Sequence, residues 1–141
     1  YIQDFSGRPP RPVTPEATYC GFSVLDGKNV WAVGVGGHWF KYPINDGSPV
    51  PVTALHGRDF MVSLDPGCRS ALVMDQWSSP VAKVEQVDLA TGSRKAVLNI
   101  APANRSGLAA CVLNDIVGDG RIYSYTAVWR TSVLLQVEAN K

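Results

Sequence analysis

Short runs of Val, Ile, Thr, Tyr, Phe and Trp recur along the chain, and Gly, Pro, Asp and Asn separate them. Runs of this length between turn-forming residues are typical of β-strands. We therefore expect strands at 19–24, 29–34, 38–43, 49–53, 59–63, 70–75, 82–88, 94–99, 109–113, 121–127 and 132–138. The 13 glycines and 10 prolines interrupt every longer apolar stripe. Helix should therefore be nearly absent, and the expected fold class is all-β.

A weak internal repeat divides these strands into similar units. The segment FSGRPPRPVT at 5–14 resembles INDGSPVPVT at 44–53, and DLATGSRKAVLN at 88–99 is a weaker third copy. The glycines of successive copies lie 40 and 45 residues apart. A second marker, a Gly turn just before an apolar-rich run, occurs at 25–33, 64–73 and 118–126. Such spacing is typical of one four-stranded blade of an antiparallel β-propeller.

The expected strands form about three blades, near 18–53, 59–99 and 109–139, and residues 1–14 resemble the end of a preceding blade. We therefore interpret 1–141 as a single propeller segment, a partial or half propeller. Closed propellers have about four to eight blades, so three blades leave two faces that another polypeptide must cover. The chain is then expected to be part of a longer protein or half of a symmetric assembly, and we favour the first.

The proline-rich stretch RPPRPVTP at 8–15 has two interpretations. It could be a polyproline II ligand for the aromatic groove of a partner. Its echo at 48–53 favours instead the outer edge strand of a blade, where proline is tolerated.

Composition and charge narrow the class of protein. The 141 residues are 45% hydrophobic and 18% charged, which fits one globular domain. Thirteen basic and twelve acidic residues give a net charge of +1 without clusters of either sign. This balance argues against a nucleic-acid partner, and no apolar stretch approaches the length needed for direct membrane insertion. The cysteines, Cys20, Cys68 and Cys111, form no metal or disulfide pattern and are expected to be small, partly buried hydrophobes.

Six segments in order carry a likeness to a known family: DFSGRPPRPVTPE, VLDGKNVWAV, WFKYPINDGSPVPV, VSLDPGCRSALVM, VEQVDLATGSRK and GDGRIYSYTAVWRTSVLLQVE. The most specific part is the ending, with a Gly turn, Tyr123 and Tyr125 in one strand, and a closing strand that ends at Val137 and Glu138. Nearly the whole chain thereby resembles the TolB-like six-bladed β-propeller at the C-terminus of bacterial eukaryotic-like serine/threonine protein kinases. The chain departs from the family pattern at 65–68, where a plain Asp-Gly turn is usual, and at 131–133 in the closing strand.

The resemblance implies an extracytoplasmic module, periplasmic or close to the membrane, that follows a kinase domain and a transmembrane helix. Such a module would act as a sensor or interaction domain. The same kind of module also follows winged-helix regulators and occurs in the periplasmic TolB protein.

The motifs of catalysis are missing from these 141 residues. There is no kinase Gly-rich loop, no His-Arg-Asp catalytic loop, no Asp-Phe-Gly, and no G-x-S-x-G nucleophile elbow of a hydrolase. The stretch GVGGH at 34–38 lacks phosphate-loop spacing, and NDIVGDG at 114–120 fails the calcium-loop pattern. His38 and His56 are better explained as loop residues than as bases. We expect no enzymatic activity, no metal and no cofactor.

Propeller geometry predicts which loops share a face. Loops between blades should lie with the loops that join the second and third strands of each blade, and these carry His38, His56, Arg58, Trp77, Ser78, Arg105, Trp129 and Arg130. Arg and aromatic side chains are enriched at recognition surfaces. We select His56, Arg58, Trp77, Arg105, Trp129 and Arg130 as candidate binding residues. The alternative is that Trp39, Trp77 and Trp129 pack between blades and the other side chains are merely solvated.

The function expected from the sequence is non-catalytic recognition of a protein or peptide partner by a sensor or scaffold module, attached to a signalling kinase. Two alternatives stay open. The chain could be the accessory propeller of a peptidase of the prolyl-oligopeptidase type. It could also be a stand-alone half-propeller that forms a homodimer to close the ring.

Overall fold

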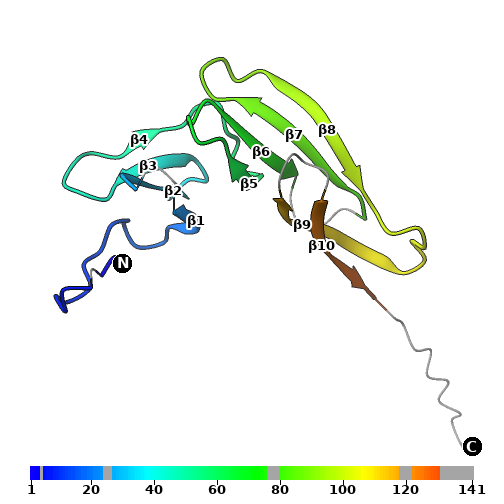
Figure 1. Cartoon of the computed structure of the whole chain (residues 1–141), viewed down its shortest axis with the longest axis horizontal. Coiled ribbons are helices and arrows are strands. Elements are labelled where there is room, and N and C mark those ends of the chain that lie inside the picture. Colours follow the sequence, from blue (N-terminus) through cyan, green and yellow to red (C-terminus); the bar gives the residue numbers. More distant parts are fainter. Residues whose placement is uncertain (4, 24–26, 76–79, 118–121, 131–141) are drawn as a thin grey trace, which may run out of the picture.

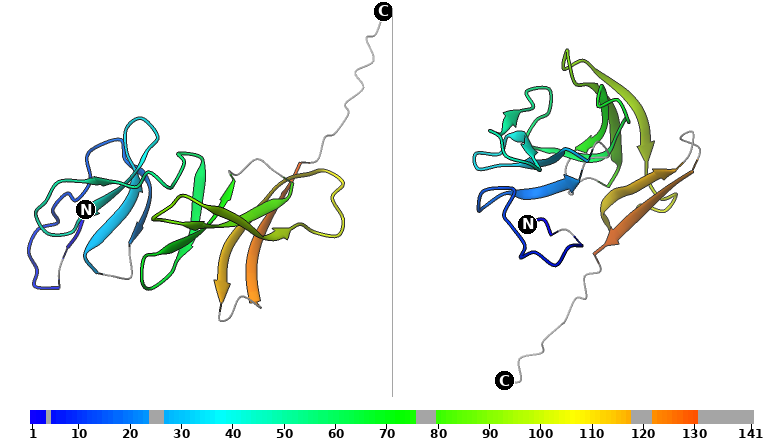
Figure 2. Two further views of the ribbon diagram at one scale, coloured as in Figure 1. Left: turned by 90° about the horizontal axis from the view of Figure 1, so that it is seen from above. Right: turned by 60° about the vertical axis from the view of Figure 1, so that its left-hand side comes forward.

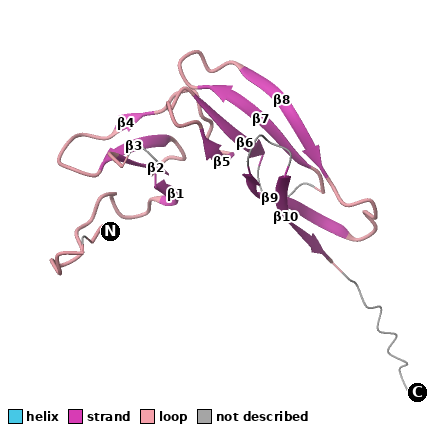
Figure 3. Ribbon diagram, in the orientation of Figure 1, coloured by secondary structure: helices cyan, strands magenta, loops and turns pink. Residues whose placement is uncertain are grey.

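A computed structural model of the chain describes residues 1–130, apart from 4, 24–26, 76–79 and 118–121. These residues form ten β-strands and no helix (Figures 1 and 3). The strands are β1 (Tyr19–Ser23), β2 (Asn29–Val33), β3 (Trp39–Pro43), β4 (Val50–Pro51), β5 (Asp59–Leu64), β6 (Ser70–Asp75), β7 (Ala82–Asp88), β8 (Arg94–Ile100), β9 (Leu108–Val117) and β10 (Ile122–Trp129). The all-β prediction is confirmed for this part of the chain. Nor do the described residues contain a helix that could cross a membrane.

The strands form three antiparallel sheets in chain order. The first contains β1-β2-β3-β4, the second β5-β6-β7-β8, and the third β9 and β10. In each sheet every strand pairs with the next strand along the chain, so both larger sheets are simple up-and-down meanders. The sheets follow one another along a curved path (Figure 2). The ten predicted strands from 19–24 to 121–127 are confirmed, whereas the predicted strand 132–138 lies outside the described residues.

The proline-rich segment 8–15 is the clear exception, because the predicted edge strand does not form there. The segment makes one isolated bridge, in which Ile2 and Arg11 exchange backbone hydrogen bonds of 2.8 and 2.9 Å. Proline has no N–H to donate, and prolines stand on both sides of Arg11, at 10 and 12, so the bridge cannot extend into a regular ladder there. In the copy at 48–53 the prediction is right, since Pro51 lies in the two-residue edge strand β4.

Two apolar clusters hold the three sheets together. Between the first and second sheets, Trp31 and Trp39 are each 1% exposed and pack with Met61 and Val73. Trp39 is therefore an interior residue, as the packing alternative predicted. Between the second and third sheets, Met74 and Leu113 are fully buried, and the Leu113 backbone N–H points at the Met74 sulfur at 3.4 Å.

The side chains of two of the three cysteines are described, and both pack as predicted. Cys111 is buried in the second cluster, where burial raises the pKa of its thiol. Cys68 is half-buried against the first cluster. The Cys20 side chain lies outside the described part.

An aspartate organises the turn between β5 and β6. One carboxylate oxygen of Asp65 accepts the backbone N–H groups of Arg69 at 2.6 Å and Ser70 at 2.5 Å. The other oxygen accepts the N–H of Gly67 at 3.1 Å. Cys68 occupies the left-handed position of this turn with a φ of 52°. The departure from a plain Asp-Gly turn is thus accommodated by one strained backbone position.

These hydrogen bonds lower the pKa of Asp65, with the N–H of Ser70 as the largest cause. A carboxyl group whose folded-state pKa is depressed stabilises the fold above its unfolded pKa, and this stabilisation is lost as the pH falls through the folded-state pKa. We expect Asp65→Asn to unfold at lower denaturant concentration than the wild type at pH 7. The difference should shrink below pH ~4, near the unfolded-state pKa of aspartate. Urea titrations across this range measure it, and a difference independent of pH would contradict the assigned role.

Candidate functional site

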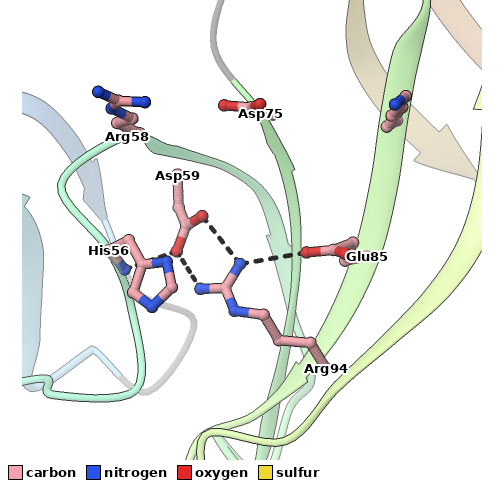
Figure 4. A pocket seen from close by; sticks show the side chains of 7 residues that line it. His56, Arg58, Asp59, Asp75, Glu85 and Arg94 are labelled. Atoms are coloured by element: carbon pink, nitrogen blue, oxygen red, sulfur yellow. Dashed lines mark hydrogen bonds and ion pairs between the residues drawn. The ribbon is translucent and has the colours of Figure 1, made fainter.

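The strongest candidate for a binding site is a cavity of about 340 Å³ beside the start of the second sheet (Figure 4). The described residues that line it are all charged or ionisable: His56, Arg58, Asp59, Asp75, Lys83, Glu85 and Arg94. We call it the charged cavity. A volume of this size is in the range of small ligand pockets, although such pockets are usually more apolar. The lining suits a polar ligand, such as part of a peptide.

The floor of the charged cavity is an ion-pair network that links three strands. Arg94, the first residue of β8, donates to both carboxylate oxygens of Asp59 at 3.0 and 2.5 Å. The same guanidinium reaches Glu85 of β7 at 3.2 Å and the carbonyl oxygen of Ala54 at 3.4 Å. The hydrogen bond with Asp59 is the largest cause that raises the pKa of Arg94. The Asp59 side chain is only 7% exposed, so its charge depends on this partner.

The backbone of the linker 52–58 also forms hydrogen bonds with Asp59. The backbone N–H of His56 donates to Asp59 at 2.6 Å, and the backbone N–H of Asp59 donates to the His56 carbonyl oxygen at 3.0 Å. That carbonyl oxygen also accepts the indole N–H of Trp39 at 3.1 Å. The backbone of His56 is therefore fixed between the two sheets, while its imidazole stays exposed at the cavity.

The carboxylates of the charged cavity all have interaction partners, whereas two of its three cations have no ion-pair partner among the described residues. Asp59 and Glu85 are ion-paired with Arg94, and Asp75 also has an interaction partner. Arg58 and Lys83 are exposed, and neither is in an ion pair with a described residue. Formal charges balance, because three cations face three carboxylates. The unused hydrogen-bonding capacity therefore lies with the donors of Arg58 and Lys83.

Strand periodicity explains why these residues meet. Asp59 and Asp75 are directly paired across β5 and β6, so their side chains share one face. Lys83 and Glu85 are two residues apart in β7 and hence also share a face. Arg94 is the first residue of β8 and pairs with Val87 of β7. Its long side chain reaches from there to Asp59.

The candidate residues selected from sequence are not all brought together. His56 and Arg58 line the charged cavity. Arg105, Trp129 and Arg130 gather elsewhere, where the turn before β9 meets the end of β10 through a 2.8 Å hydrogen bond from the Arg130 N–H to the Gly107 carbonyl. Trp129 is half exposed.

Three further residues of the predicted loop face lie apart from these two groups or outside the described residues. Trp77 and its neighbour Ser78 lie outside the described residues. His38 is exposed in the loop between β2 and β3.

Sequence reasoning missed five residues of the charged cavity: Asp59, Asp75, Lys83, Glu85 and Arg94. The alternation in β7 gave a usable signal. Lys83 and Glu85 alternate with the apolar residues Ala82 and Val84, which are buried, so the two charged side chains are expected on the other face of the strand. No local signal pairs Asp59 with Arg94, which are 35 residues apart.

The described residues of the charged cavity present hydrogen-bond donors and acceptors to a ligand. Among the described residues that line it there is no Ser, Thr or Cys that the His56 imidazole could activate as a nucleophile. Within the described ranges, no group of three His, Cys, Asp or Glu side chains is placed to hold a metal ion. The site offers an ion-paired floor and the hydrogen-bond donors of Arg58 and Lys83.

No family model matches the chain, and no match was found among curated proteins or solved structures. The likeness to TolB-like propellers therefore rests on the sequence segments quoted above.

Proposed function

We propose that this chain is a non-catalytic recognition module whose charged cavity binds a carboxylate carried by an acidic peptide segment of a partner protein. The proposal rests on the two cations of the cavity that have no ion-pair partner among the described residues. Arg58 and Lys83 line the cavity without an ion pair among the described residues, whereas its carboxylates all have partners. A carboxylate is the complement of such donors, and arginine can hold it through two parallel hydrogen bonds.

The balanced formal charge of the cavity favours a peptide over a small free anion. Long-range attraction of an anion needs a net positive field, and three carboxylates offset the three cations here. Recognition then depends on short-range hydrogen bonds, which need a ligand that other contacts hold in place. A peptide supplies such contacts through its backbone, and the exposed His56 imidazole at the rim is available to it.

The wider identity that we propose is a segment of a TolB-like β-propeller from a bacterial serine/threonine kinase. Two successive four-stranded antiparallel meanders support it, because this is the repeating unit of a propeller. The spacing of the sequence repeat supports the same proposal. The accessory propeller of a peptidase is the alternative of another class, and the half-propeller homodimer is a third. Hydrolysis of peptides or esters by the chain itself would overturn the non-catalytic assignment.

Calorimetric titration of capped tripeptides tests the ligand chemistry. We expect a peptide with a central glutamate to bind at least about tenfold more tightly than its glutamine counterpart, because hydrogen bonds to a charged group contribute about 1.5–3 kcal/mol. Arg58→Ala and Lys83→Ala should each weaken the glutamate peptide about tenfold. Lys95→Ala is the matched control, because Lys95 is an exposed cation of β8 outside the cavity lining. Equal binding of both peptides, or an equal loss in the control, would reject the proposal.

A further inference from the structure

The charged cavity contains one histidine, His56, among the described residues that line it. Histidine is the side-chain type that gains or loses a proton between about pH 5 and 8. Carboxylic acids, lysine and arginine ordinarily titrate outside this range, and the other described lining residues are of these types. Residues 76–79, which follow Asp75, are Gln, Trp, Ser and Ser and add no titratable group. The charge of the cavity therefore depends on the protonation of His56.

The backbone of His56 is held in place, while its side chain is open to the cavity. The His56 N–H donates to the Asp59 carboxylate at 2.6 Å. The His56 carbonyl oxygen accepts the Asp59 N–H at 3.0 Å and the indole N–H of Trp39 at 3.1 Å. The imidazole takes part in none of these bonds and lies exposed at the cavity (Figure 4). A change in the charge of the ring therefore leaves the hydrogen bonds of the linker intact.

The His56 imidazole shares the cavity with charged groups from the linker and from four strands of the second sheet. These groups are Arg58 of the linker, Asp59 of β5, Asp75 of β6, Lys83 and Glu85 of β7, and Arg94 of β8. The loop between β2 and β3, which contacts the linker at Gly57, carries His38. With a neutral His56 the described lining holds three cations and three carboxylates. Protonation of His56 changes its formal charge from zero to +1.

We propose that protonated His56 is a third donor, beside Arg58 and Lys83, for the carboxylate of the acidic peptide, so that the cavity binds this peptide more tightly at mildly acidic pH. The inference rests on the proposed function. A further cation beside Arg58 is unfavourable without ligand, and the carboxylate of the peptide offsets this repulsion. Bound peptide and bound proton therefore favour one another, and this coupling is reciprocal. A neutral imidazole can donate one hydrogen bond but contributes no charge.

Calorimetric titration of the full chain with the capped glutamate tripeptide, at about pH 5.5 and about pH 8, tests the inference. Glutamate, with an ordinary pKa of about 4.3, is largely ionised at both values. We expect the wild type to bind about fivefold more tightly at the lower pH, because a charge-assisted hydrogen bond is stronger than a neutral one. His56→Gln keeps a neutral donor and should bind like the wild type at the higher pH, without the gain at the lower pH.

His38→Gln is the matched control, because His38 is the other histidine of the chain and lies exposed outside the described cavity lining. It should retain the full pH dependence. Titrations near pH ~6.5 in two buffers of different ionisation enthalpy give a second readout. Binding should take up a fraction of a proton in the wild type and in His38→Gln, and none in His56→Gln. Circular dichroism at both pH values establishes that the variants fold.

The other outcomes separate this inference from the proposed function. If the wild type binds the glutamate peptide equally well at both pH values, His56 does not act as a charged donor, and the proposed function stands. If the pH dependence persists in His56→Gln, another group causes it, and the inference is likewise overturned. If the glutamate peptide does not bind at either pH, the proposed function fails and this inference fails with it.

Discussion

Arg94→Met should lower the free energy of unfolding by about 3 kcal/mol, because it removes the only cation that holds Asp59 among the described residues. Methionine can fill much of the same space, but it leaves a carboxylate that is 7% exposed without its bidentate partner. The carbonyl of Ala54 and the carboxylate of Glu85 lose a donor at the same time. The value is taken at the lower end of the range for broken buried ion pairs, because the Arg94 side chain is 20% exposed. Urea unfolding followed by tryptophan fluorescence measures the change.

Two further variants separate the ion pair from other effects of this substitution. Lys95→Met, one residue further along β8, should change stability by less than about 0.5 kcal/mol, since Lys95 is exposed. The double variant Asp59→Asn/Arg94→Met should lose less than the sum of the two single losses, because the residues interact directly. Additive losses would mean that the observed pair contributes nothing as a pair.

Gly57→Ala should be comparably destabilising, by about 3 kcal/mol, because it forces two loops apart. A Cβ atom at Gly57 would lie 1.9 Å from the carbonyl oxygen of Gly37 and 2.9 Å from its carbonyl carbon. Both contacts are with backbone, so no side chain can turn away to relieve them. The loop between β2 and β3 and the linker to the second sheet therefore touch at Gly57. Thermal and urea unfolding of the variant measure the cost.

Gly47→Ala is the control for the loss of glycine flexibility. A Cβ at Gly47 would meet only the ring of Pro43, with the nearest atom 3.1 Å away. We expect a change below about 1 kcal/mol there. If Gly57→Ala is equally mild, the two loops are not in contact, and the position assigned to His56 beside them is wrong.

Local patterns were sufficient to predict most strands. β6 and β7 agree with the predicted ranges 70–75 and 82–88, because turn-forming residues bound each apolar run. β9 was predicted at 109–113 but continues to Val117. Asn114 and Asp115 are poor strand residues in isolation, and pairing with β10 carries the strand through them.

The failed prediction at 8–15 has a different origin. Similarity to 48–53 suggested the same structure, but an edge strand also needs a neighbour with which to pair. Val50 and Pro51 lie beside Lys41 and Phe40 of β3, whereas segment 8–15 pairs with the described residues through a single bridge, to Ile2. The sequence repeat was informative about spacing and not about pairing.

The candidate site was only partly predictable because its centre is non-local. His56 and Arg58 could be placed in a loop between sheets from the strand pattern alone. The network beneath them depends on how the linker folds back onto the second sheet, where the Ala54 carbonyl meets the guanidinium of Arg94. That contact joins residues 40 positions apart, and no spacing rule identifies it.

A map of backbone amide chemical shifts during titration with the capped glutamate tripeptide would show directly where the ligand binds. We expect shifts concentrated at the linker around His56 and Arg58 and at Lys83 of β7. The glutamine peptide should leave these amides largely unchanged. Shifts confined to β10, or none with either peptide, would contradict recognition at the charged cavity.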